Sequence, residues 1–129
     1  VVTTLVFAVD RIMQPREGQQ PDVVRGVLTD NLRLLSKHGV RIAVGSDSYR
    51  QTSLAEILAL EKLKVFDNRT LLKMWCETTP AAIFPDRKIG LLREGYEASL
   101  LALDGDPIED FLNVAKIATR VKRGMVLAG

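Results

Sequence analysis

The sequence predicts an α/β fold that begins with two neighbouring parallel strands and ends in a small β unit. Two apolar, β-branched runs, residues 1–9 and 40–44, flank a segment with helical apolar spacing. Strand, helix and strand in one sheet form a right-handed parallel crossover. After residue 86, glycines punctuate short β-forming segments, which indicates a separate β unit.

The first half of the chain supplies the parallel strands. Residues 1–9 are apolar nearly throughout, as in a strand buried on both faces. Residues 10–21 contain two prolines and Gly18, and they are predicted to form a loop. A helix then begins at Asp22, an N-cap residue, and ends at Gly39, which suits a left-handed terminal turn. Its apolar stripe consists of Val24, Val27, Leu28, Leu32 and Leu35.

The second half is predicted to be helical first and β-rich later. Ser53 and Glu56 form a capping box that opens a helix through about residue 66. Asp67 or Asn68 caps the next helix, which ends before Thr78. The remaining predicted elements are a helical turn at 81–84, strands at 98–103 and 117–121, and a hairpin from Gly124 into 125–127. A boundary near residues 85–88 divides the chain into domains 1–86 and 87–129.

The composition describes a globular chain and excludes several partners. With 129 residues, 47% of them hydrophobic, the chain is one domain's worth of sequence or the pieces of two. Eighteen basic and 16 acidic residues give a net charge of only +2, and this small excess does not indicate nucleic-acid binding. No apolar run approaches the ~20 residues of a membrane helix. Because the chain opens on Val1 rather than methionine, we expect that residues upstream of it have been lost.

The strand at residues 40–44 runs into Gly45, Ser46 and Asp47. The carboxyl ends of parallel strands collect catalytic groups, and Gly45 lets a ligand or metal approach the backbone closely. The alternative is a turn aspartate that hydrogen-bonds its own backbone. Both interpretations of Asp47 are open on these residues alone.

Other polar groups have simpler structural explanations. His38, the only histidine, lies in the last turn of a predicted helix, where the helix dipole favours it. One histidine and one cysteine, Cys76, provide no local zinc ligand set, and Cys76 is expected to be a small buried hydrophobe. A later acidic group lacks the spacing of a calcium loop and predicts a turn. This group consists of Asp104, Asp106, Glu109 and Asp110.

Three stretches in order carry a resemblance to a known family. They are residues 38–47 (HGVRIAVGSD), residues 78–82 (TTPAA), and the glycine-punctuated segments 90–107 and 121–126. Together they resemble the C-terminal portion of a metal-dependent amidohydrolase, nearest to the imidazolonepropionase and prolidase-like branch. One departure is Ser99, where many relatives carry an aspartate after the alanine.

The resemblance implies a fold and a site. The fold would be the C-terminal part of a (β/α)8 TIM-type barrel, strands seven and eight with their helices, plus part of a small β-sandwich domain. The family binds one or two divalent metals, commonly zinc, mainly through histidines on earlier strands. Asp47 would be the catalytic aspartate and metal ligand after strand eight. Tyr49 and Arg50 would contact substrate, with packing at a helix entry as the equal alternative.

Two hypotheses of function follow from the resemblance. In the first, the chain is a C-terminal fragment of a hydrolase that cleaves an amide, peptide or cyclic amide bond through a metal-activated water. The fragment alone would be inactive and hold no metal, and it would pair with the missing N-terminal segment or another copy. The substrate of the parent would be a small molecule or peptide. In the second, the chain is a non-enzymatic remnant or interaction module.

Overall fold

The computed structural model describes residues 1–15, 17–18, 20–46 and 52–127 of this mixed α/β chain. The chain divides into two compact units, Val1–Asp67 and Asn68–Gly129, and each is described by itself. The predicted assignment of 1–86 to a barrel segment and 87–129 to a small β domain stays a prediction. Among the helices of the described ranges, none is both long and apolar enough to cross a membrane.

The first unit contains the predicted pair of parallel strands. Strand β1 (Val2–Thr3) pairs in parallel with β2 (Ala43–Val44), with Val2 opposite Ala43 and Thr3 opposite Val44. The Gly45 amide donates to the Thr3 carbonyl oxygen over 3.0 Å, which extends the pairing past β2. Parallel pairing of these two segments was predicted and is confirmed, although both strands are shorter than the apolar runs that predicted them.

The prediction of a strand over residues 1–9 is wrong beyond Thr3. Helix α1 (Val6–Met13) follows β1 at once, so the predicted loop at 10–21 also begins too early. Periodicity alone does not separate a short buried strand from a buried helix. Here Val9 and Ile12, three residues apart, are both buried on one helical face, and this tertiary burial decides in favour of the helix.

Helix α2 (Pro21–Lys37) confirms the predicted helix, but its N-cap residue is Gln20, two residues before the predicted Asp22, which lies within the first turn. Proline occupies the first helical turn, where no backbone N–H is needed. His38 is the C-cap residue, and Gly39 has a φ of +67°, so the helix ends in the left-handed turn that the sequence predicts.

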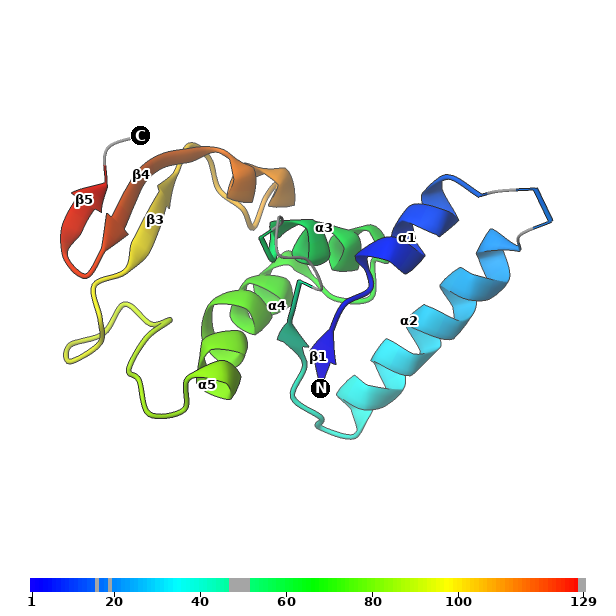
Figure 1. The fold of residues 1–129 in the computed structure, drawn as a ribbon, viewed down its shortest axis with the longest axis horizontal. Coiled ribbons are helices and arrows are strands. Elements are labelled where there is room, and N and C mark those ends of the chain that lie inside the picture. The colour runs from blue at the N-terminus through cyan, green and yellow to red at the C-terminus, as the bar shows by residue number, and fades with distance from the viewer. Residues whose placement is uncertain (16, 19, 47–51, 128–129) are drawn as a thin grey trace. The chain divides into compact units, whose positions relative to one another are not determined.

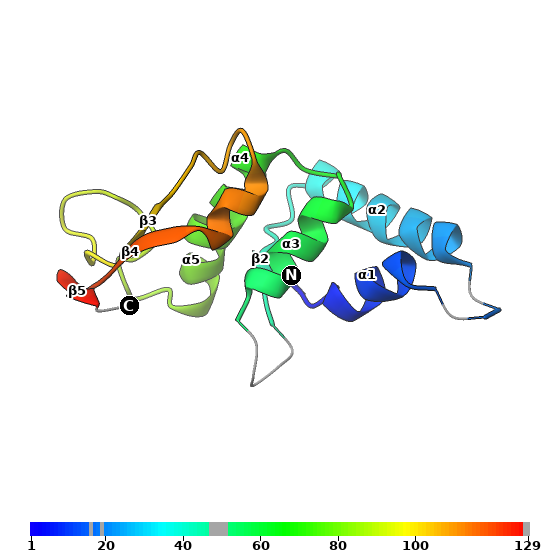
Figure 2. The same cartoon turned by 90° about the horizontal axis from the view of Figure 1, so that it is seen from above.

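The core of the first unit lies where the strand pair meets its helices. Helix α3 (Leu54–Lys62) begins where predicted but ends before residue 66, and Lys64 adopts a φ of +53° just beyond it. Helix α1 lies beside both α2 and α3 (Figures 1 and 2). The buried apolar residues of this unit are Val9, Ile12, Leu32, Ile42, Ala43, Val44, Ile57, Ala59, Leu60 and Leu63.

The second unit begins with a continuous helical segment. Helix α4 (Asn68–Lys73) leads into a π-helical turn (Met74–Thr78) and then into α5 (Thr79–Ile83). The predicted stop before Thr78 is wrong, because proline is tolerated in the first turn of a new helix. The Thr79 hydroxyl donates to the Met74 carbonyl oxygen over 2.7 Å within the widened turn.

The predicted β unit is confirmed as an antiparallel sheet in the order β3-β4-β5 (Figure 1). Its strands are Leu100–Leu103, Ile117–Lys122 and Met125–Leu127. Arg123 and Gly124 join β4 to β5 with φ angles of +51° and +78°, the combination that a tight two-residue hairpin requires. A 3₁₀ helix (Phe111–Ala115) lies between β3 and β4 and buries Phe111 and Val114.

We predict that Gly45→Ala destabilises the first unit. A Cβ at Gly45 would lie 2.7 Å from the Thr3 carbonyl oxygen and 2.8 Å from Val2 Cγ1, so β1 would have to move. Overpacking of this kind costs about 1 to 3 kcal/mol in the free energy of unfolding, which denaturant titration measures.

The matched control is Gly26→Ala within α2, where an added Cβ meets no atom within 4 Å. This change is expected to stabilise the chain by about 0.5 to 1 kcal/mol, since glycine disfavours a helix interior. Equal effects of the two substitutions would contradict the close approach at Gly45.

Candidate functional site

The candidate site begins at the carboxyl end of β2. Asp47, Tyr49 and Arg50, the site residues predicted from the sequence, lie outside the described residues, so their placement is untested. The structure does describe the strand that precedes them: Val44 is buried, and Gly45 and Ser46 continue the chain from the end of β2. Gly45 presses against the β1 backbone, so its lack of a side chain is needed for strand packing.

A buried carboxylate lies in the same unit. Glu56 on α3 is only 1% exposed, and its Oε1 accepts a hydrogen bond from the Leu5 amide over 2.7 Å. The sequence pattern assigns Glu56 to a capping box and does not reveal its bond to Leu5. The available signal was its spacing, because Glu56 stands four residues before buried Leu60 on the same helix face.

The predicted capping box is not borne out for Ser53. Ser53 occupies the N-cap position of α3, but its side chain makes no capping hydrogen bond in the described part of the chain. Glu56, the third residue of that helix, accepts a hydrogen bond from the Leu5 amide with its carboxylate. The acid that a sequence pattern assigns to a local cap therefore ties two helices together.

The described residues do not form a metal site. Within them, no three side chains of histidine, cysteine, aspartate or glutamate gather closely enough to hold an ion. His38 lies exposed at the end of α2. A metal would therefore need ligands beyond the described residues.

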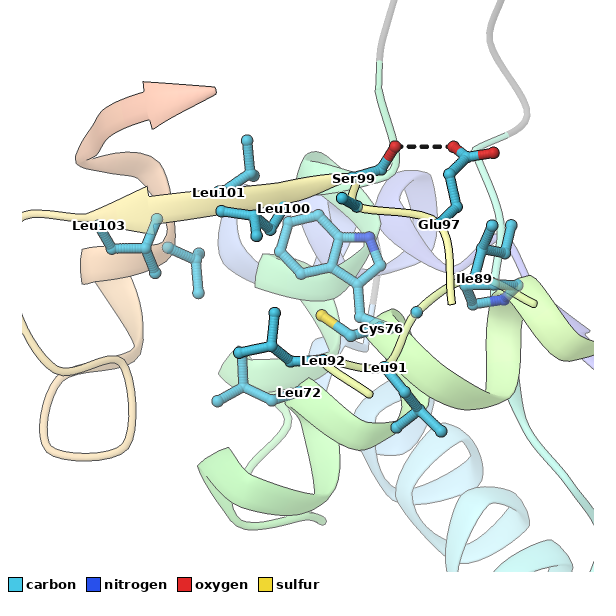
Figure 3. A pocket seen from close by; sticks show the side chains of 15 residues that line it. Leu72, Cys76, Ile89, Leu91, Leu92, Glu97, Ser99, Leu100, Leu101 and Leu103 are labelled. Atoms are coloured by element: carbon cyan, nitrogen blue, oxygen red, sulfur yellow. Dashed lines mark hydrogen bonds between the residues drawn. The ribbon is translucent and has the colours of Figure 1, made fainter. Parts of the chain in front are cut away.

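The second unit contains an apolar pocket of about 580 Å³. Figure 3 shows Leu72 and Cys76 of the helical segment on one side and Leu100 and Leu103 of β3 on the other. Gly90 also lines the pocket. Its φ is +91°, and an added Cβ would collide with the Cys76 carbonyl oxygen. The full lining comprises Leu72, Trp75, Cys76, Pro80, Ile89, Gly90, Leu91, Leu92, Glu97, Ala98, Ser99, Leu100, Leu101, Leu103 and Val114.

The acidic group at the pocket, Glu97, is held in a polar network. The Ser99 hydroxyl and Arg87 Nη2 each donate to its carboxylate over 2.7 Å, and Arg123 Nε lies 3.6 Å away (Figure 3 shows the Ser99 bond). Hydrogen bonds from Ser99 and then Arg87 lower the pKa of Glu97. The Ser99 oxygen also accepts from the Arg123 amide over 3.1 Å. These bonds fasten the loop before β3 to the hairpin, which is a structural role.

Cys76 lies on the pocket wall and is exposed, so the expectation that it is buried is wrong. The surrounding chain still desolvates its thiol, and this effect, followed by the charge of Glu77, raises the pKa of Cys76. A raised pKa leaves the thiol neutral at physiological pH. Cys76 is therefore poorly suited to be a nucleophile.

The acidic group after β3 forms a turn, as predicted. Asp106 Oδ1 accepts from the Ile108 amide over 2.7 Å, and Asp110 Oδ1 accepts from the Leu112 amide over 3.0 Å. Both carboxylates thus bind the backbone two residues on, which is the Asx-turn pattern.

Comparison with known proteins identifies the family. The model of the Amidohydrolase family matches residues 12–127, and the chain belongs to that family. No protein in the curated set matches it significantly.

Solved structures share its fold. A prolidase complexed with N-methylphosphonate-L-proline superposes with a TM-score of 0.70 at 22% identity over 98% of this chain. An amidohydrolase gives 0.74 at 18% identity over 100%, and a Xaa-Pro dipeptidase with bound methionine in its active site gives 0.68 at 20% over 100%. The chain spans about a third of these proteins, 34%, 34% and 35% of their lengths.

We predict that Cys76 titrates above the ordinary thiol value and alkylates slowly at neutral pH. The rate of iodoacetamide labelling against pH gives the pKa directly. Because the Glu77 charge raises this pKa, Glu77→Gln is expected to lower it and to increase labelling at pH 8; desolvation remains the larger cause.

Glu109→Gln is the control, since the charge of Glu109 is not among the causes of the Cys76 shift. A labelling midpoint at or below that of a free cysteine would contradict the prediction.

Proposed function

We propose that this chain is the C-terminal portion of a hydrolase that cleaves a C–N bond in an amide, peptide or cyclic amide. In this proposal β1 and β2 are strands seven and eight of a (β/α)8 barrel. Strands β3 to β5 belong to a small β-sandwich domain. Membership of the Amidohydrolase family over residues 12–127 supports the proposal.

The observation that carries the proposal is the parallel pairing of β1 with β2 next to Gly45 and Ser46. Barrel strands are parallel neighbours, and barrel enzymes place their catalytic groups just after the carboxyl ends of such strands. Asp47 is the first acidic residue after β2. We therefore propose Asp47 as the catalytic carboxylate and the metal ligand of this chain.

The role proposed for Asp47 is to orient the attacking water and accept its proton. A divalent metal, which we propose to be zinc, would lower the pKa of that water when bound. Its other ligands would come from residues outside this chain. Tyr49 and Arg50, which follow Asp47 directly, are proposed to contact the substrate. Xaa-Pro dipeptides are the first substrates to test, because a prolidase and a Xaa-Pro dipeptidase share the fold.

We predict that Asp47→Asn lowers turnover of the complete hydrolase roughly 100-fold or more, the usual contribution of a proton-accepting group. Initial rates on Xaa-Pro dipeptides and N-acyl amino acids measure this effect. Asp22→Asn, an exposed acid on α2, is the control and should leave the rate unchanged. Residues 1–129 alone should show no zinc-dependent hydrolysis.

Near-normal turnover of the Asp47→Asn variant would reduce Asp47 to a turn residue. Zinc-dependent hydrolysis by residues 1–129 alone would overturn the proposal that the site needs ligands from elsewhere. If the complete protein lacks activity on every amide tested, that result would favour the alternative that the chain is a non-enzymatic interaction module.

We also propose that this chain pairs with an N-terminal segment of the same protein or with another copy of itself. Within the described residues, β1 and β2 form a sheet of two strands, and β3 and β5 are the outer strands of theirs. Leu101 on β3 and Val126 on β5 are exposed. Strand edges of this kind, rich in exposed apolar side chains, favour pairing with a further strand.

We predict that residues 1–129 alone self-associate at micromolar concentration, which sedimentation velocity measures. Leu101→Lys, on β3, should weaken the association because it places a charge on an outer strand. Val23→Lys is the control, because Val23 is similarly exposed, 58% against 51% for Leu101, but lies on α2 rather than on a strand. This change should leave the association unchanged. A cooperatively unfolding monomer at every concentration would contradict this prediction.

A further inference from the structure

Glu56 is a buried acid that the proposed chemistry leaves unused. Its side chain is among the largest fully buried ones of the chain, and it lies on α3 beside buried Ile57 and close to Leu60. Burying a carboxylate in apolar surroundings is costly unless hydrogen bonds compensate. A glutamate at this position therefore calls for a role that an apolar residue would not fill.

That role is visible at the start of α1. Leu5 is the N-cap residue of α1, and its apolar side chain offers no capping oxygen. In a capping box, a glutamate at the third helical position accepts the N-cap amide, but Ala8 occupies that position here. Glu56 Oε1 accepts the Leu5 amide at 2.7 Å from a different helix. The partial positive charge at the start of α1 favours a carboxylate there.

The same bond fixes the end of β1. Leu5 follows Thr3 by two residues, and the Thr3 carbonyl oxygen accepts from the Gly45 amide over 3.0 Å. Gly45 also lies so close to Thr3 and Val2 that a side chain would not fit between them. A backbone held at Leu5 thus holds Thr3, and Thr3 holds Gly45, two residues before Asp47.

We propose that Glu56 is a positioning residue that sets where the chain leaves β2 toward Asp47. The bond to the Leu5 amide locks the end of β1, and the β1–β2 pairing transmits this constraint to Gly45 and Ser46. The effect of this positioning on catalysis rests on the function proposed for Asp47. The mechanical part of the proposal, that the Glu56–Leu5 bond fixes Gly45 and Ser46, concerns described atoms alone.

Amide hydrogen exchange of residues 1–129, measured by ¹⁵N NMR, tests the mechanical part. Glu56→Leu and Glu56→Asp should raise the exchange rate of the Leu5 amide at least tenfold, because one lacks an acceptor and the other is a methylene shorter. Resonances of Gly45 and Ser46 should shift in both. Glu56→Gln keeps an acceptor at full reach and should restore Leu5 protection.

Glu61→Gln, a second acid on α3, is the control and should leave Leu5 exchange unchanged. If Glu56→Leu fails to fold, the comparison of Glu56→Asp with Glu56→Gln tests the proposal. Unchanged Leu5 exchange in Glu56→Asp, or loss of protection in Glu56→Gln equal to that in Glu56→Asp, would overturn the proposal.

The functional part is read in the complete hydrolase. Glu56→Asp should lower kcat about tenfold with little change in KM, and Glu56→Gln should restore kcat; a KM effect alone, or no effect, would overturn positioning. A failed Asp47→Asn test would remove the proposed function and leave the exchange result standing. The two failures are therefore distinguishable.

Discussion

The close backbone approach of β1 and β2 is the constraint on which the first unit depends. Two-residue strands make few ladder hydrogen bonds, so their pairing needs support from outside the ladder. Gly45 provides part of it, because the absence of a side chain lets the end of β2 lie against Thr3 and Val2. The rest comes from the apolar core of this unit, in which α1 packs against α2 and α3 while Ala43 and Val44 of β2 are buried.

Glu56 shows how a buried polar side chain can add specificity to such a core. Apolar burial is non-directional and would tolerate several placements of α1 against α3. The hydrogen bond that the Glu56 carboxyl group accepts from the Leu5 amide is directional and favours a placement that keeps this bond. The cost of burying the acid is thereby coupled to a defined position of Leu5, just after the carboxyl end of β1.

The second unit is organised differently. Asp106 and Asp110 bind local turns and Glu97 binds its polar network, while the sheet leaves apolar side chains of β3 and β5 exposed. Polar groups that bind their own backbone or neighbouring arginines define loop geometry without forming a reactive centre. The pocket beside β3 is correspondingly apolar, with a neutral thiol on its wall.

The sequence by itself determined the elements whose signals are local. The glycine end of α2, the hairpin at Gly124 and the Asx turns depend on the φ preferences and hydrogen bonds of single residues. Only the tertiary structure decided that residues 6–13 are a helix and that Glu56 reaches Leu5. An apolar run satisfies a strand or a helix equally, and the packing of α1 against α2 and α3 selects the helix. An acid can accept from a local or a distant amide, and the packing of α1 against α3 brings the Leu5 amide to Glu56.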